Sequence, residues 1–355
     1  MPLDRITTVQ AAIDTGTYGT PQAVTVNDGF IVFNPELTVN KEHYNRSVGD
    51  AYARPSRAGV VGKRNVQITF SQELRGFPGI MTDTTDAPQF HVFMQACSLS
   101  VDDGTAAKKY ETPDKFVGLK SCTIVMNQDG LKWSIAGCRG TAVMRFEMGA
   151  PAMIDYTFSG IYADPVADAA AQMDYYDGTT GFIDYAPEIV IGATLTFDPF
   201  GDAPAAGEYG HLSNISLDFR NQIIARMSST IGSTGTGEFL ITGRGSREDP
   251  GAMLSFDVEL PGNNAGVTTI SWWDRFMEQT KDQGTSASAS AALSLVVGSA
   301  AASKLITVQL GGLFLRDVSM TRLDGDRWGH TVEARILGTS DSTSEDDISI
   351  TCSAS

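Results

Sequence analysis

The sequence lacks the short motifs that mark most metal, redox and hydrolytic sites. Its four cysteines form no C-x-x-C pair, and its four histidines are scattered through the 355 residues. No G-x-S-x-G motif occurs, and the glycines of residues 232–237 are not followed by the Lys-Ser/Thr of a phosphate-binding loop. We therefore expect no enzymatic activity, no cofactor and no metal, and we expect buried, reduced cysteines.

Positive charge and long apolar runs are also scarce. The formal net charge is −16, with 26 basic and 42 acidic side chains, which argues against a broad basic surface that binds nucleic acid. No segment approaches 18 consecutive apolar residues, so we expect no membrane-spanning helix. The first residues lack the basic and apolar regions of a signal peptide, so we expect a protein that is not secreted.

Short stretches of alternating apolar and polar side chains are abundant. Residues 120–162 show the pattern most clearly, because Ile154, Tyr156 and Phe158 alternate with polar or charged residues. A period of two is typical of strands with one buried face. Turn-forming sequences interrupt the pattern at 129–130, 137–140 and 149–151. The segment therefore predicts an antiparallel meander of about four strands within a mainly β fold.

Two segments have the apolar spacing of an amphipathic helix, residues 86–97 and 269–281. Between them, residues 164–188 contain six carboxylates and no Lys or Arg, which favours a solvated acidic linker over a metal site. We therefore predict two tandem β-sandwich or partial-barrel domains, each with one flanking helix. The predicted divisions are a first domain at 1–163, the linker at 164–188 and a second domain at 189–355.

The two halves share an order of elements and a few matching sequences. The segment TFSQELRG at 69–76 resembles FDVELPG at 256–262, and residues 144–161 align with 320–337 without a gap. Any one of these matches could arise by chance, but their order along the chain is the same in both halves. This colinear order predicts an internal duplication.

One segment is basic within the acidic chain. Residues 41–64 lack apolar periodicity and carry six basic against two acidic side chains, a net charge of +4. Long loops of this kind are often functional or disordered. We predict a long loop that contacts a partner, with a solvated mobile loop as the alternative. The candidate contact residues are Arg46, Arg54, Arg57, Lys63 and Arg64.

Two stretches of the chain resemble the major tail tube proteins of tailed bacteriophages. One is residues 121–165, which end in F-x-G-x-Y-x-x-P, and the other is residues 212–262, with N-x-I and T-x-R followed by D-P. The resemblance implies a β-sandwich or partial barrel whose copies form rings, and the rings stack into a hollow tube for DNA. With a duplicated fold, three chains would form a ring with pseudo-sixfold symmetry.

The resemblance also implies partners and a location. Other copies would form the ring, with tape-measure protein and loosely held DNA in the lumen, and tail terminator and distal tail proteins at the ends. The basic segment 41–64 would contact the next ring, and no membrane is involved. The protein would assemble in the host bacterial cytoplasm and belong to the virion tail.

Polar strand faces would line the lumen, where acidic side chains would repel the phosphates of DNA within a Debye length, roughly 8–10 Å. The candidate lumen-facing residues are Glu147, Asp155, Thr157, Ser159, Asp257, Glu259 and Glu333.

Three other functions fit the sequence less well. A head-decoration or tail-terminator protein would share the virion setting, but a terminator normally needs one short domain. A monomeric ligand- or glycan-binding β-sandwich would expose an aromatic cluster. The four tryptophans are instead expected in the core or against helices, at positions Trp133, Trp272, Trp273 and Trp328. A hydrolase would need a catalytic cluster that the sequence does not indicate.

Overall fold

The computed structural model of the chain describes residues 7–25, 28–46, 57–76, 87–103, 107–113, 116, 118–128, 131–147, 149–167, 190, 212–227, 236–259, 293–297, 305–310, 312–323, 327–337 and 348–353. The predicted helix at 269–281 and most of the predicted linker at 164–188 lie outside these residues.

The described residues form nineteen strands and one short helix, so the fold is mainly β, as predicted. The elements are β1 (Thr7–Ile13), β2 (Gly29–Phe30), β3 (Phe33–Arg46), β4 (Arg57–Glu73), α1 (His91–Ala96), β5 (Ser100–Asp103), β6 (Ala107–Glu111), β7 (Cys122–Gln128), β8 (Leu131–Phe146), β9 (Met153–Ile161), β10 (Val166–Ala167), β11 (Leu212–Asp218), β12 (Asn221–Met227), β13 (Thr236–Arg244), β14 (Met253–Glu259), β15 (Leu293–Val297), β16 (Leu305–Leu310), β17 (Gly312–Leu323), β18 (Arg327–Leu337) and β19 (Ile348–Ser353).

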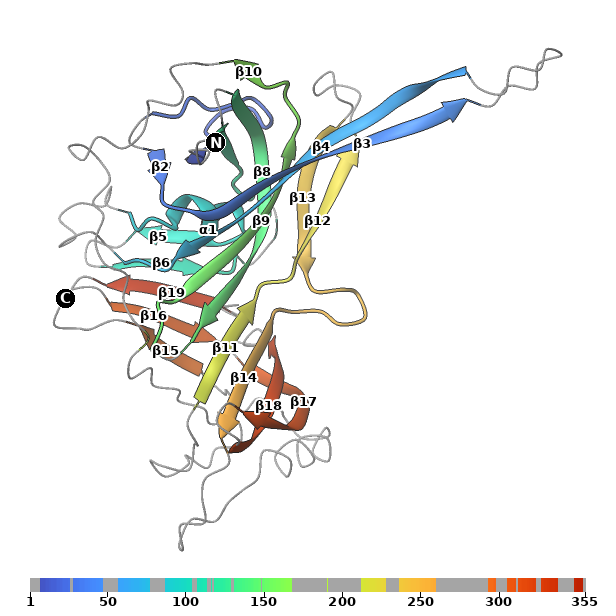
Figure 1. Ribbon diagram of the computed structural model, residues 1–355. Helices are drawn as coiled ribbons and strands as arrows, with labels where there is room; N and C mark the ends of the chain where they lie inside the picture. Colours follow the sequence, from blue (N-terminus) through green and yellow to red (C-terminus); the bar gives the residue numbers. More distant parts are fainter. Residues whose placement is uncertain are drawn as a thin grey trace, which may run out of the picture.

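Eight strands form a continuous antiparallel sheet, which we call the main sheet. Its order is β17-β18-β14-β11-β8-β9-β4-β3, and the pair β8–β11 joins the two halves of the chain. Figure 1 shows this sheet running from the red strands β17 and β18 to the blue strands β3 and β4. Ile154, Tyr156 and Phe158 face the core from β9, which confirms the alternation predicted for this strand.

Two smaller sets of strands and the helix complete the core. The first set is β2-β1-β7, continued by the N-terminal part of β8 and by β10, and the second is β15-β16-β19-β6-β5. Helix α1 packs between the main sheet and the first set, since the Phe93 ring lies 5.0 Å from Phe70, 5.7 Å from Phe158 and 4.7 Å from Phe30. The helix begins after Phe90, so it is shorter than the predicted segment 86–97.

Strand β8 is longer than the sequence pattern suggested. We predicted a turn at residues 137–140, but β8 continues through them and shifts register between Ala136 and Arg139. Gly137 has φ of +64° there, a conformation that glycine adopts without steric cost. The resulting bulge bends the strand without ending it. β8 pairs with β7 up to Cys138 and with β9 from Ala136 onward.

The two halves repeat one pattern of strand pairing. Met144 faces Ile154 across β8 and β9, and Met320 faces His330 across β17 and β18. Met320 and His330 each lie 176 positions after their counterparts, Met144 and Ile154. This is the offset of the gapless alignment of residues 144–161 with 320–337. The preceding hairpins also correspond, because Leu37 faces Ile68 across β3–β4 while Leu217 faces Leu254 across β11–β14. The pairing supports the predicted duplication.

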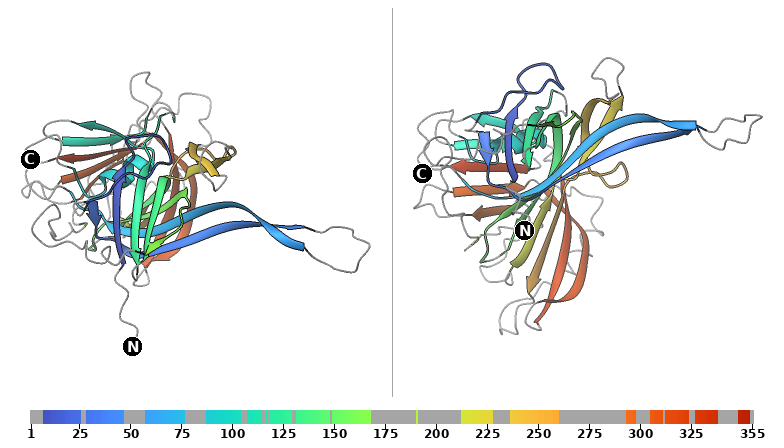
Figure 2. Two further views of the ribbon diagram at one scale, coloured as in Figure 1. Left: turned by 90° about the horizontal axis from the view of Figure 1, so that it is seen from above. Right: turned by 45° about the horizontal axis from the view of Figure 1, so that its top comes forward.

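The prediction of a long loop at 41–64 is wrong for most of these residues, because they lie largely in strands β3 and β4. The outer part of this hairpin, residues 41–46 and 57–64, is called arm 1 below. Arm 1 extends away from the body in all three ribbon views (Figures 1 and 2). The alternation is hard to recognise in the sequence because the described side chains of this part of β3 are exposed on both faces.

The second half has a corresponding hairpin, β12–β13, called arm 2 below. Ile223 faces Ile241 in arm 2 as His43 faces Val61 in arm 1, with an offset of 180 residues in both strands. After arm 2 the offset increases to 186, which places a six-residue insertion at 245–250. A bridge between Gly245 and Pro250 closes this insertion, and the chain of arm 2 leaves the main sheet there.

Candidate assembly surfaces

The contact between the two halves is an ordinary antiparallel strand pair. Met144 of β8 faces Leu217 of β11, and Phe146 faces Ile215. All four side chains are buried, and the backbone N–H of Phe219 continues the ladder to the carbonyl of Ala142 at 3.0 Å. The junction therefore combines main-chain hydrogen bonds with an apolar seam on the core side.

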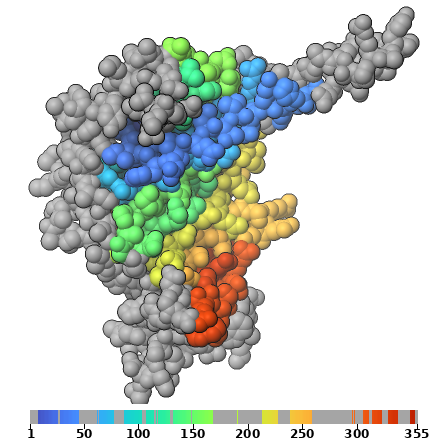
Figure 3. All heavy atoms as spheres, viewed as in Figure 1, coloured from blue at the N-terminus to red at the C-terminus, as the bar shows by residue number. Residues whose placement is uncertain are grey.

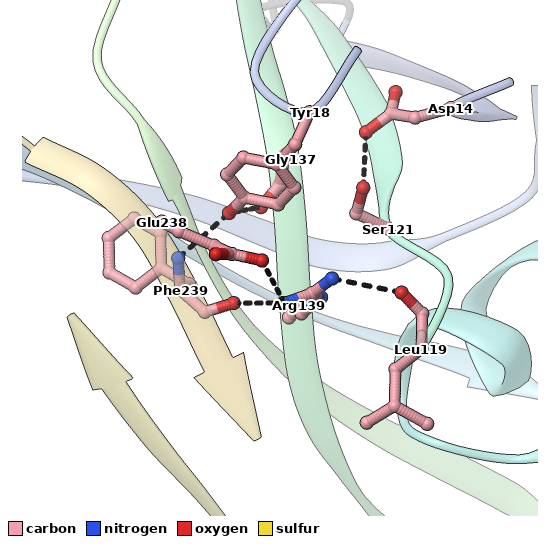
Figure 4. A network of polar contacts seen from close by, with 8 residues as sticks. All are labelled: Asp14, Tyr18, Leu119, Ser121, Gly137, Arg139, Glu238 and Phe239. Atoms are coloured by element: carbon pink, nitrogen blue, oxygen red, sulfur yellow. Dashed lines mark hydrogen bonds and ion pairs between the residues drawn. The ribbon is translucent and has the colours of Figure 1, made fainter. Parts of the chain in front are cut away.

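Arm 2 is held on the first half by a buried arginine. The guanidinium of Arg139 donates from Nη1 to the Phe239 carbonyl at 2.6 Å and forms an ion pair with Glu238 at 3.1 Å. Its Nη2 donates to the Leu119 carbonyl at 2.9 Å. Figure 4 shows these groups around Arg139, with Glu238 and Phe239 on one side and Leu119 on the other. The Arg139 side chain is 8% exposed, so these partners are needed to compensate its desolvation.

Tyr18 completes this contact. Its hydroxyl donates to the Gly137 carbonyl at 2.6 Å and accepts from the Phe239 N–H at 2.9 Å, while the Arg139 guanidinium lies 5.0 Å from the ring centroid. Burial raises the pKa of the Tyr18 phenol, against smaller opposing effects of the Phe239 N–H and the Arg139 charge. Tyr18 thus remains a neutral donor that links the bulge of β8 to arm 2. We call Tyr18, Arg139, Glu238 and Phe239 the arm clamp.

The insertion after arm 2 is also fixed by charge. Asp249 forms ion pairs with Arg220, which follows β11, at 2.9 Å and with Arg316 of β17 at 2.7 Å. The N–H of Gly245 donates to the Arg220 carbonyl at 2.8 Å. These contacts hold the bend between β11 and arm 2, so arm 2 lies against the first half instead of continuing straight from the sheet.

The two ends of the main sheet have no strand partner among the described residues. β3 pairs only with β4 there, and β17 pairs only with β18. The residues of β11 lie 180 positions after their counterparts in β3. The residues of β17 lie 176 positions after their counterparts in the C-terminal part of β8. The two open edges are thus the counterparts of the two strands that meet at the in-chain junction.

Large apolar side chains are exposed at these open edges. Met320 of β17 is 64% exposed, whereas its counterpart Met144 is 0% exposed. Val39 of β3 is 39% exposed, whereas its counterpart Phe219 is 0% exposed. Arm 1, in blue, projects from the body beside the β3 edge (Figure 3). An unpaired edge strand presents free N–H and C=O groups, which are a template for pairing with another chain.

The structure places the predicted basic contact residues mainly on arm 1. Arg46, Arg57 and Lys63 lie in strands β3 and β4, and Arg54 lies outside the described residues. The Arg64 side chain is described and lies at the base of arm 1. It is 4.0 Å from the Asp164 carboxylate and 5.6 Å from the Tyr162 ring centroid, so part of its charge is used within the chain.

The predicted lumen-facing residues gather on one face of the main sheet, with two exceptions. Asp155, Thr157 and Ser159 alternate with buried residues along β9. On β14 and β18, Asp257 and Glu333 are likewise flanked by buried residues. Glu147 is exposed just after β8, and the side chain of Glu259 lies outside the described residues.

This face is polar but only partly acidic. Asp155 accepts a hydrogen bond from the Ser71 hydroxyl at 2.6 Å and forms an ion pair with Arg145 at 2.6 Å. Asp257 accepts from Asn214 and from Thr331. Asp155 and Asp257 alternate with buried residues, as the sequence pattern predicted, but the pattern did not indicate that Arg145 forms an ion pair with Asp155.

A shallow depression lies beside the in-chain junction. It has a volume of about 340 Å³ and is lined by Arg145, Phe146, Glu147, Pro151, Met153, Asn214, Ile215 and Ser216. Among the described residues, no three His, Cys, Asp or Glu side chains gather closely enough to hold a metal ion. The one described helix, α1, is too short and too polar to cross a membrane. All four cysteines are free and buried, as predicted.

Sequence reasoning missed the arm clamp and the exposed edge residues. Trp328 was expected in the core, but it is 58% exposed near the start of β18. Trp133 is partly buried against the core, as expected, and Trp272 and Trp273 lie outside the described residues. The gapless alignment pairs Met144 with Met320, which was the one available signal that β17 repeats a buried junction strand.

No protein-family model matches this sequence, and no curated protein sequence matches it significantly.

Proposed function

We propose that this protein is a structural subunit of a bacteriophage tail tube, in which copies close into rings and the rings stack into a hollow conduit for DNA. One observation supports this assembly above the others. The chain contains a junction between two equivalent units, and the counterparts of the two junction strands are left as open edges at opposite ends of the same sheet.

Such an arrangement favours a closed ring. The open edges differ from each other, so a contact between them is head-to-tail and can repeat around an axis. Three chains would bring six units together, and the main sheets would join into one large barrel whose width grows with the number of strands. The in-chain contact would then recur between chains, which gives pseudo-sixfold symmetry from a trimer.

The polar face of the main sheet suits the inner wall of this barrel. Its described side chains include the short hydroxyls of Thr157 and Ser159, and Asp155 is paired with Arg145. The net charge of −16 adds a repulsion that acts across roughly 8–10 Å at physiological salt. DNA and the tape-measure protein would therefore pass without tight binding.

Stacking of rings would use arm 1. This hairpin projects beyond the body (Figure 2), and residues 41–64 have a net charge of +4 in an acidic chain. Arm 2 is clamped to its own chain by Arg139, so arm 1 is the arm with reach toward another ring. Its partner would be acidic surface on the neighbouring ring, with the tail terminator and distal tail proteins at the two ends.

Electron microscopy of the concentrated, purified protein tests this proposal. We expect hollow filaments of constant width that lengthen with protein concentration. Separate compact particles at every concentration would contradict it. The exposed Trp328 also suits a glycan-binding β-sandwich, and such a protein would remain monomeric and would bind oligosaccharides in a calorimetric titration.

A further inference from the structure

The in-chain junction fixes a register that can be transferred to the two open edges. Within the chain, Ser216 of β11 faces Arg145 of β8, and Leu217 faces Met144. The β11 residues correspond to Glu36 and Leu37 of β3, because Leu217–Leu254 and Leu37–Ile68 are equivalent pairs. The β8 residues correspond to Thr321 and Met320 of β17.

We propose that β17 of one chain pairs antiparallel with β3 of the next chain in this same register, with Glu36 opposite Thr321 and Leu37 opposite Met320. The inference rests on the proposed ring assembly, and it adds the strands, the register and the residues of the contact between chains. The partner is a second copy of this chain.

The exposure of the core-side residues supports this register. Leu217 and Met144 are buried where they meet, whereas Leu37 is only partly buried and Met320 is 64% exposed. Pairing at the proposed register would place Leu37 and Met320 against each other on the core side. Val39 is 39% exposed on the same face of β3, two residues further along, and it would extend the seam.

The alternative pairings fit less well. A shift of one residue would turn Met320 to the polar face of the partner sheet, because side chains alternate along a strand. Arg322 stands where the first half has Phe146, and Pro35 stands where it has Ile215. The apolar seam therefore ends at this position, and Pro35 offers no N–H to extend the ladder.

Disulfide cross-linking tests the register at residues on the polar face of the sheet. The test variant carries Glu36→Cys and Thr321→Cys, which the register places directly opposite. The out-of-register control carries Glu36→Cys and Asp317→Cys, four residues away on β17. The in-chain control carries Arg145→Cys and Ser216→Cys, which face each other within one chain and show whether this position accepts a disulfide. The native cysteines are buried and are present in all variants.

We expect the test variant to form covalent dimers and closed covalent trimers at least about tenfold faster than the out-of-register control, because a disulfide tolerates little separation of Cβ atoms. Two single variants, Glu36→Cys and Thr321→Cys, should cross-link only when mixed. Hollow filaments without cross-linking of the test variant, while the in-chain control oxidises, would overturn this junction but not the proposed function. Linked pairs of identical single variants would also overturn it. A parent chain that never associates would overturn both.

Discussion

Asn34 and Asn214 occupy the same position in the two halves of the chain and share a left-handed backbone, with φ of 49° and 51°. Each lies inside a register shift of its hairpin, between Phe33 and Glu36 in β3 and between Ser213 and Ser216 in β11. The same bulge is therefore present near the start of β11, which forms the in-chain junction, and of its counterpart β3, which is an open edge.

We expect substitution of these asparagines to separate backbone strain from side-chain contacts. Asn34→Ala should lower the free energy of unfolding by about 1 kcal/mol, because alanine tolerates a positive φ poorly. Asn34→Gly should be close to neutral, since glycine adopts this conformation without a Cβ clash. Urea denaturation measures both variants. Equal stability of the alanine and glycine variants would show that the bulge is not under this constraint.

Removal of the Arg139 guanidinium should release arm 2. In Arg139→Leu, the Glu238 carboxylate and the carbonyls of Phe239 and Leu119 lose their donor, which should cost about 2–3 kcal/mol. Leucine is chosen because it keeps an apolar side chain at this buried position without a charge. Hydrogen exchange of residues 236–244 should accelerate while β9 stays protected. The matched control Arg145→Leu removes an exposed ion pair with Asp155 and should cost less than about 1 kcal/mol.

Tyr18→Phe should weaken the same clamp by about 1–2 kcal/mol at neutral pH, because the Gly137 carbonyl and the Phe239 N–H both lose a partner. The difference in stability between the wild-type protein and Tyr18→Phe should become smaller as the pH rises. Burial raises the pKa of Tyr18 in the folded chain, so the unfolded chain loses its phenolic proton first and the wild-type protein loses stability as pH rises above about 10. Urea titrations from pH 8 to 11 would measure the difference. A wild-type advantage that stays constant over this range would contradict the assignment.

Charge placed at the two equivalent methionines should have opposite consequences. Met144→Glu buries a carboxylate in the seam of the in-chain junction and should abolish folding or cost several kcal/mol. Met320→Glu changes a mostly exposed side chain and should leave the unfolding free energy within about 0.5 kcal/mol of wild type. It should nevertheless block association, which sedimentation velocity would measure. Normal association of Met320→Glu would argue against β17 as a contact.

Charge reversal on arm 1 should separate ring formation from stacking. Replacing Arg54, Arg57, Lys63 and Arg64 by glutamate should leave the circular dichroism spectrum and the rings intact but prevent filament growth. High salt should shorten wild-type filaments for the same reason, since screening weakens contacts between opposite charges. Filament lengths in electron micrographs report both effects. Filaments that are indifferent to salt would mean that the stacking contact is mostly apolar.

The sequence predicted the fold class and the repeat because both depend on local patterns. Alternation along β9 reflects one buried and one polar face, and the gapless alignment at Met144 and Met320 reflects a shared register. It failed at 41–64, where β3 and β4 form an arm with no core beneath it and therefore no apolar period. It also failed at Gly137, where a bulge and a turn have the same local sequence.

The assembly surfaces were harder to predict because they depend on pairing between distant residues. Arg139 meets Glu238 and Phe239 from a position about a hundred residues away in the chain, and nothing in its neighbourhood distinguishes it from a surface arginine. Trp328 looked like a core residue because its strand alternates normally. Only the order of the described strands shows that the neighbouring strand β17 is the last of the main sheet.

The central claim is that the open edges β3 and β17 pair with other copies of this chain. The mass of the smallest stable particle tests this claim most directly. Native mass spectrometry at low protein concentration and moderate salt should resolve a ring before stacking. We predict a dominant species of three chain masses, which disappears in Met320→Glu. A dominant single-chain particle at every concentration would contradict the account, as would a two-chain particle built from identical edges.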